Sequence, residues 1–219
     1  MGAGIPKQFI KVCGHTILEY SVDAFESSPA IDEIAIVSNV AYIDRVQELV
    51  KTRGWKKVRK ILDGGKERYD SSLAAINAYK GYREANLIIH DAVRPLVSAK
   101  IIEDVVEALA AHPAVEVAVP VVDTVIVNRG GVVQEIPDRS LLWRVQTPQA
   151  FRIEVISEAF RRALEDPDFK VTDDAGVVYR YMKEIPIQVV RGEESNIKLT
   201  YPDDLAVIEN LIKSRNHEQ

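Results

Sequence analysis

The sequence predicts an α/β fold, in which a mostly parallel sheet is covered by helices on both faces. Short apolar runs typical of strands alternate along the chain with segments of helical periodicity. One segment departs from this alternation and is typical of a β-hairpin. The 219 residues, 47% of them hydrophobic, suffice for one core, so a single domain spanning residues 1–219 is expected.

The predicted elements follow one another in a regular order. Strands are expected at 34–37, 58–62, 87–90 and 115–122, and helices at 43–53, 71–79 and 99–111. In the first of these helices Val46, Leu49 and Val50 recur at helical spacing. Because helices lie between the strands, parallel pairing through crossover helices is favoured.

The departure from this order is a predicted hairpin at about 123–139. Two β-branched runs, 124–127 and 132–136, are joined by Asn128-Arg129-Gly130-Gly131. Its apolar residues Val125, Val127 and Val133 would be exposed on an isolated ribbon, so the hairpin is a natural place for subunit contact. The alternative is a surface hairpin without a role.

Composition narrows the class of protein. The formal net charge of -5 argues against a general nucleic-acid binder. Cys13 is the only cysteine, which excludes disulfides within the chain and indicates a reducing, cytoplasmic setting. The apolar runs are too short to span a membrane, and no signal peptide is recognisable. We expect neither nucleic acid nor membrane as a partner.

Charged residues follow the predicted strand at 87–90. In an open α/β sheet, ligands bind beyond the carboxyl ends of the strands, where Asp91 and Arg94 lie. A carboxylate there suits Mg²⁺ shared with phosphate oxygens, and a nucleoside triphosphate is the candidate ligand. The alternative is a helix-capping aspartate beside a solvated arginine. His90 closes an apolar strand and is interpreted as structural.

A glycine pair follows the preceding strand. Gly64 and Gly65 would let backbone N–H groups approach a base or a phosphate closely, with Lys66 beside them. Asp70 or Ser71 is expected to open the next helix, and Ser71 is either a ligand contact or only an N-cap.

Two lysines lie near the ends of the chain. Lys198 falls in a predicted strand at 196–200, where Ile197 and Leu199 alternate with polar neighbours, so Lys198 should face away from them. A lysine is a compact charge that suits phosphate. Lys7 follows Pro6, and each lysine taken singly is more often solvent-exposed than functional.

Taken together, ordered blocks of sequence resemble the IspD/TarI cytidylyltransferase family from Met1 to about Leu205. The blocks are Pro6-Lys7-Gln8, Gly64 to Arg68 with Asp70-Ser71, His90 to Pro95, Asp123-Thr124, Arg139 to Phe151, Thr172 to Ala175, and Gly192 with Asn196 to Thr200. The resemblance implies a Rossmann-like nucleotidyltransferase that uses Mg²⁺, CTP and an alditol phosphate, and releases pyrophosphate and a CDP-alditol.

The resemblance also implies roles for individual residues. Lys7 and Lys198 match catalytic positions, and Asp91 matches the metal position. Nucleotide-binding positions are matched by Gly64, Gly65, Lys66, Ser71, Asp91 and Ala92. Positions that bind the alditol phosphate are matched by Arg94, Thr124, Arg139, Thr147 and Thr172. The hairpin matches a dimerisation arm, so Thr124 and Arg139 are expected in the partner's active site of a homodimer.

The chain differs from the family at its start. Family members begin with a strand and a loop of the form Ala-Gly-Gly-x-Gly-x-Arg-Met-Gly, and this sequence starts where that Met-Gly would stand. A late start codon or a truncation is expected, with activity dependent on the missing strand, loop and arginine. A non-catalytic nucleotide-binding homologue is the alternative from another class.

The family resemblance leaves the alditol open. Val125 followed by Ile126, together with His90-Asp91-Ala92-Val93-Arg94-Pro95, favours D-ribitol 5-phosphate. The segment 142–146 favours 2-C-methyl-D-erythritol 4-phosphate (MEP). MEP is ranked first because enzymes acting on it are the more widespread. A sugar-1-phosphate nucleotidyltransferase fits the 146–149 block and the hairpin poorly.

Overall fold

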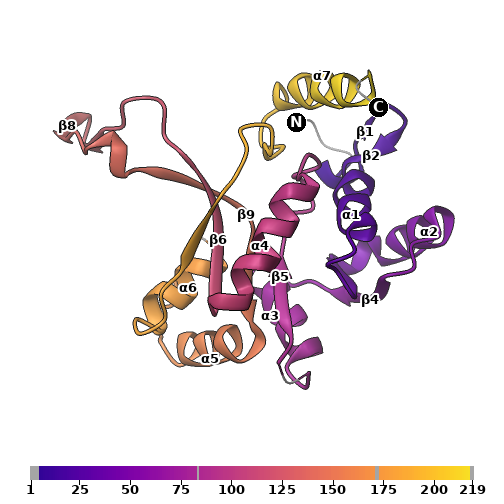
Figure 1. Cartoon of the computed structure of the whole chain (residues 1–219), viewed down its shortest axis with the longest axis horizontal. Coiled ribbons are helices and arrows are strands. Elements are labelled where there is room, and N and C mark those ends of the chain that lie inside the picture. Colours follow the sequence, from indigo (N-terminus) through magenta and orange to yellow (C-terminus); the bar gives the residue numbers. More distant parts are fainter. Residues whose placement is uncertain (1–4, 83, 171–172, 218–219) are drawn as a thin grey trace.

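The computed structural model describes residues 5–82, 84–170 and 173–217 of the chain (Figure 1). Its helices are α1 (Ile17–Ser27), α2 (Ile43–Arg53), α3 (Arg68–Tyr79), α4 (Ala99–Ala111), α5 (Ile153–Leu164), α6 (Asp174–Tyr181) and α7 (Asp204–His217). Its strands are β1 (Lys11–Val12), β2 (His15–Thr16), β3 (Ile34–Ser38), β4 (Val58–Asp63), β5 (Asn86–Ile89), β6 (Ala114–Pro120), β7 (Val127–Arg129), β8 (Val132–Glu135), β9 (Trp143–Arg152) and β10 (Gln188–Arg191). None of the helices in these ranges is long and apolar enough to cross a bilayer.

The larger sheet has the strand order β10-β6-β9-β5. Strands β10 and β6 are parallel, whereas β9 runs antiparallel to both β6 and β5. Consequently β5, β6 and β10 share one direction, and β9 is the exception. The predicted α/β class with a mostly parallel sheet is confirmed, and the long antiparallel strand is an addition to it.

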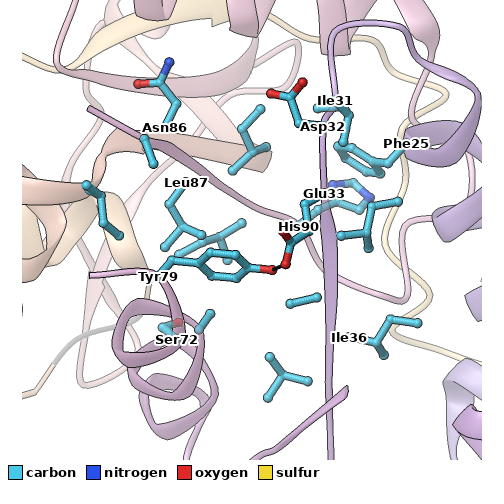
Figure 2. Close-up of a pocket in the computed structure, with 18 of the residues that line it drawn as sticks. Phe25, Ile31, Asp32, Glu33, Ile36, Ser72, Tyr79, Asn86, Leu87 and His90 are labelled. Carbon is cyan, nitrogen blue, oxygen red and sulfur yellow. Dashed lines mark hydrogen bonds between the residues drawn. The ribbon is translucent and has the colours of Figure 1, made fainter. Parts of the chain in front are cut away.

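Strands β3 and β4 form a separate parallel pair. Between β3 and β5 lies a cavity of about 770 Å³, lined along its length by both strands and by α1, α3 and α4. Figure 2 shows Ile36 on one side of the cavity and Leu87 on the other, with His90 near Phe25. Side-chain packing, with no pairing between these two strands, therefore joins the two parts of the sheet.

Helix boundaries have local causes. Helix α1 begins with a capping box, in which the Thr16 hydroxyl accepts from the Glu19 N–H and the Glu19 carboxylate accepts from the Thr16 N–H. Helix α2 ends at Gly54, whose φ of 67° is the left-handed conformation that glycine adopts readily. Ser98 caps α4 by accepting from the Ile101 N–H.

The arm comprises residues 121–142 and carries β7 and β8. It projects from the body of the molecule (Figure 1). Gly130 and Gly131 take φ values of 61° and 83°, which a tight two-residue hairpin turn requires. Apolar side chains on the arm are exposed, among them Val132 at 61% and Ile136 at 65%. One subunit alone thus leaves this apolar surface in water.

Most predicted elements are confirmed, and three are corrected. The first hairpin strand lies at Val127–Arg129 instead of the predicted 124–127, since only the residues next to the Gly130–Gly131 turn pair with β8. The helices at 43–53 and 99–111 have the expected bounds. Helix α3 begins at Arg68, earlier than predicted, because the Asp70 carboxylate accepts from the Glu67 N–H and caps the first turn. The predicted strand at 196–200 is wrong: this segment lies next to Val93, whose carbonyl accepts from the Leu199 N–H, but forms no ladder.

Candidate active site

Asp91 is the centre of a charged cluster just beyond β5. Its Oδ2 lies 3.0 Å from Lys198 Nζ and 3.4 Å from Arg94 Nε. The Asp91 side chain is 16% exposed and that of Arg94 is 11% exposed, whereas Lys198 is 43% exposed. The cluster therefore joins the segment after β5 to the segment after β10, which are about a hundred residues apart in sequence.

The charges in the cluster favour an ionised aspartate. Burial disfavours the charged carboxylate of Asp91, but Lys198, Arg68 and Arg94 outweigh it and lower the pKa of Asp91. Burial also lowers the pKa of Arg94, and Asp91 opposes that shift. An ionised carboxylate amid cations suits a ligand that brings both phosphate and a divalent metal.

Buried His90 holds the turn that carries Asp91. Its Nε2 donates to the Arg94 carbonyl at 3.0 Å, so its Nδ1 accepts from the Thr147 hydroxyl, also at 3.0 Å. The Thr147 oxygen in turn accepts from the Asp91 N–H at 3.0 Å. Burial lowers the pKa of His90 to about 4, in keeping with a neutral ring. Both ends of the 91–94 turn are thereby anchored to one imidazole.

The same network constrains Thr147. This residue is only 5% exposed, and its hydroxyl proton is already donated to His90. Any contact that Thr147 makes with a phosphate must replace that hydrogen bond. In this structure its hydroxyl serves chiefly to link β9 to the Asp91 turn.

The predicted nucleotide residues face the same region from two sides. Of these, Ser71, Asp91 and Ala92 line the cavity between β3 and β5. The Gly64 N–H donates to the Ser38 carbonyl at 2.7 Å, and a Cβ on Gly64 would lie 2.9 Å from the Ser71 hydroxyl. At Gly65 a Cβ would collide with Asp70. Position 65 therefore requires glycine for the turn to pack against α3, whereas at Gly64 only the Ser71 hydroxyl would have to shift.

Lys66 and Lys7 are placed differently within the predicted site. Lys66 is exposed on the turn before α3. Lys7 Nζ donates to the Thr200 carbonyl, two residues beyond Lys198. The two predicted catalytic lysines therefore belong to neighbouring segments.

The predicted alditol-binding residues are not all brought together in the described chain. Arg94 belongs to the Asp91 cluster and Thr147 adjoins it. Thr124 and Arg139 lie on the arm, where Arg139 Nη1 donates to the Val122 carbonyl at 2.7 Å. Thr172 lies outside the described residues.

Two buried amides support the site without having been assigned a role from sequence. Asn196 donates from Nδ2 to Gln146 Oε1 at 3.2 Å and to the Thr147 carbonyl at 2.9 Å. Gln149 Oε1 accepts from the N–H groups of Asp174 and Ala175, each at 3.1 Å. Both lie in sequence blocks that carry the family resemblance, but polar residues lie among their neighbours, so no local pattern indicated that either amide would be buried.

Comparison with known proteins decides the family. The family description "IspD: 2-C-methyl-D-erythritol 4-phosphate cytidylyltransferase" matches residues 1–214. The chain belongs to the IspD family. It is consequently an enzyme, a nucleotidyltransferase of the cytidylyltransferase type.

Individual relatives agree with this assignment. A 2-C-methyl-D-erythritol 4-phosphate cytidylyltransferase of Thermobifida fusca (strain YX) is 45% identical over 220 residues, covering 98% of this chain and 88% of that protein. The bifunctional ribulose 5-phosphate reductase/CDP-ribitol pyrophosphorylase Bcs1 of Haemophilus influenzae is 40% identical, covering 99% of this chain but 46% of that protein.

A solved structure confirms the IspD fold. The 4-diphosphocytidyl-2C-methyl-D-erythritol synthase from Anaerococcus prevotii DSM 20548 superposes with a TM-score of 0.87 at 28% identity, covering 97% of this chain and 92% of that one. The resemblance drawn from the sequence blocks is therefore confirmed for family and fold.

Proposed function

We propose that this IspD-family enzyme transfers CMP from CTP to MEP, giving 4-diphosphocytidyl-2-C-methyl-D-erythritol and pyrophosphate. The observation that carries the proposal is the Asp91–Lys198–Arg94 cluster in a chain matched to the IspD family over residues 1–214. The family match and the Thermobifida relative favour MEP over D-ribitol 5-phosphate. The non-catalytic alternative is not favoured.

The proposed reaction is a single displacement at phosphorus. A phosphate oxygen of MEP bonds to the α-phosphorus of CTP, while the bond from that phosphorus to the α,β-bridging oxygen breaks and pyrophosphate leaves. Such chemistry depends on positioning and charge neutralisation and needs no covalent protein nucleophile. Lys198, at 43% exposure, can leave Asp91 and turn toward the α-phosphate, and Lys7 supplies a second cation from the adjacent segment.

The residues present fit a magnesium ion that is shared with the nucleotide. Among the described residues no group of three or more His, Cys, Asp or Glu could enclose a metal. Mg²⁺ in phosphoryl-transfer sites is held by one or two carboxylates together with substrate phosphates, and Asp91 is suited to be that carboxylate. Both of its ion pairs use Oδ2. The ion would neutralise charge on the phosphates of CTP.

The nucleotide would be held between two segments. The Gly64–Gly65 turn offers close backbone approach to the cytosine, Lys66 and Ser71 adjoin it, and Ala92 follows Asp91 on the opposite side. The alditol phosphate would meet Arg94 and Thr147, with Thr172 a further candidate that the described structure does not include.

The arm supports a homodimer with composite sites. A two-stranded ribbon is marginal in water, and the exposed apolar side chains of this one need a partner surface. Arg139 has the forked donors that suit a phosphate, but it lies on the arm. We therefore propose that Thr124 and Arg139 act in the site of the partner subunit.

The test is a pyrophosphate-release assay on the full-length protein with CTP, MgCl₂ and either MEP or D-ribitol 5-phosphate. We expect turnover with MEP that is abolished by EDTA. A clear preference for ribitol 5-phosphate would replace the proposed substrate. Absence of turnover with both would refute the proposed function.

A further inference from the structure

Arg144 is an exposed cation close to the predicted alditol side of the site. It lies on β9, three residues before Thr147, and its side chain is 56% exposed. Its Nη2 donates to Glu194 Oε2 at 2.5 Å, and the Glu194 side chain is 63% exposed. Among the described residues, neither side chain has another hydrogen-bond or ion-pair partner. Because an exposed ion pair stabilises a fold only weakly, the Arg144 guanidinium can exchange this partner for a ligand.

The strand places Arg144 over the loop that borders the site. Residues two apart in a strand point to one face of the sheet, so Arg144 and Gln146 share a face. Gln146 Nε2 donates to the Glu193 carbonyl at 2.9 Å, while Arg144 contacts Glu194, the next residue. The loop at 193–196 therefore lies across this face of β9, and Arg144 contacts its solvent-exposed part.

Arg94 contacts the same loop at its other end. Its Nη1 donates to the Asn196 carbonyl at 2.8 Å, two residues after Glu194. Burial, and to a smaller extent the charge of Arg144, lower the pKa of Arg94, so the two guanidinium groups lie within electrostatic reach of each other. A doubly charged anion bound between two cations would relieve their repulsion.

Arg94 alone offers little to a phosphate. Its side chain is 11% exposed, and its guanidinium is already engaged by the Asn196 carbonyl and the Asp91 carboxylate. A phosphate monoester carries close to two negative charges at neutral pH and is bound best by forked guanidinium donors. Arg144 presents such donors to solvent, so it can supply the contacts that Arg94 cannot.

We propose that Arg144 is a substrate-binding residue that contacts the phosphate of the alditol phosphate, and that Glu194 is the anion this phosphate replaces. The inference rests on the proposed function. The substrate phosphate and the Glu194 carboxylate compete for one guanidinium, so binding exchanges one ion pair for another. Arg144 thus sets the affinity for the alditol phosphate, while the displacement at the α-phosphorus remains with Lys198 and Lys7.

The experiment measures kcat and KM for MEP at saturating CTP and Mg²⁺. In Arg144→Gln the KM for MEP should rise about tenfold, the low end of what a hydrogen bond to a charged group contributes. Its kcat should stay unchanged, because the contact is equal in the ground and transition states. Glu194→Gln removes the competing anion and should lower this KM by up to about fivefold, the scale of an exposed ion pair. The double variant should resemble Arg144→Gln, since Glu194 acts only through Arg144.

Arg161→Gln is the matched control. Arg161 lies on α5, is also 56% exposed, and its Nη1 lies 2.7 Å from Glu165 Oε1. The substitution removes the same charge, at the same exposure, from a helix that carries no predicted site residue. This variant should keep the wild-type KM for MEP, which separates a local contact from a change in net charge.

An unchanged KM for MEP in Arg144→Gln would overturn the inference. A KM change of the same sign in Arg144→Gln and Glu194→Gln would overturn it as well, because a purely structural ion pair is lost equally in both. Arg144 lies two residues after the arm, so the oligomeric state of each variant is measured by light scattering. A raised KM that accompanies loss of the wild-type oligomer would assign Arg144 to a subunit contact instead.

Failure of the proposed function is recognised separately. Absence of wild-type turnover with MEP and with D-ribitol 5-phosphate would refute the proposed function. The affinity for MEP, measured by calorimetry on the same variants, would then test Arg144, with the same opposite signs expected for Kd. A wild-type protein that binds no MEP would overturn the inference too.

Discussion

Protonation of His90 should weaken the folded protein at acidic pH. The ring is buried and neutral, with both nitrogens in hydrogen bonds to Arg94 and Thr147. Its pKa falls from 6.5 to about 4 on folding. Between pH 6.5 and pH 4 the unfolded chain therefore binds a proton at His90 that the folded chain does not bind. The free energy of unfolding falls as the pH falls through this range.

The magnitude follows from the shift. A difference of about 2.5 pKa units corresponds to about 3 kcal/mol of unfolding free energy lost between pH 6.5 and pH 4. Glu116 acts in the opposite sense, because burial and Asp173 raise its pKa to about 7, so the folded state binds a proton there as pH falls. The Glu116 contribution is the same in two proteins that differ only at position 90, so it cancels when their stabilities are compared.

The assay compares wild type with His90→Gln by urea unfolding at several pH values. The variant keeps an amide for hydrogen bonding but cannot titrate. We expect it to be less stable than wild type at neutral pH, and the difference should shrink by about 3 kcal/mol on lowering the pH to 4. Parallel stability curves for the two proteins would refute the buried, neutral imidazole.

Three further predictions concern the active site. Asp91→Asn should weaken Mg²⁺-dependent CTP binding in calorimetry, and unchanged affinity would remove Asp91 from metal binding. Lys198→Ala should lower kcat about 100-fold or more, because it removes a preorganised charge that acts in the transition state; a change in KM alone would assign it to binding only. Mixing Arg139→Ala and Lys198→Ala subunits should restore part of the activity, since one site of the heterodimer carries neither lesion. No recovery despite subunit exchange would place Arg139 in its own subunit's site.

Local sequence patterns predicted an element well where the spacing of its apolar residues alone defined it. The helix at 99–111 was recognisable because Ile101, Ile102, Val105 and Leu109, the residues it buries, recur at helical spacing. The ten-residue strand β9 was not, because its polar residues Gln146, Thr147 and Gln149 are buried by partners distant in sequence. Hydrogen bonding to Asn196, His90 and Asp174 makes that burial possible, and no local pattern reports it.

The segment at 196–200 shows the converse. Ile197 and Leu199 alternate with polar residues as in a strand, and Lys198 does face away from buried Leu199. The segment nevertheless pairs with no strand. The Asn196 carbonyl accepts from Arg94 Nη1, and the Asn196 side chain donates to the Thr147 carbonyl, so these groups bond outside any ladder. Alternation therefore predicted the orientation of Lys198 correctly and its secondary structure wrongly.

The division of the sheet at the cavity also bears on how the enzyme could move. The Gly64–Gly65 turn follows β4, whereas Asp91 follows β5, so the two flanks of the nucleotide site belong to different parts of the sheet. No backbone hydrogen bond among the described residues ties β3 to β5. Side-chain contacts alone join the β3–β4 pair to the larger sheet, so we expect the amide hydrogens of β3 to exchange faster than those of β6 and β9. Such a difference in exchange rate would show that the two flanks of the nucleotide site open independently of each other.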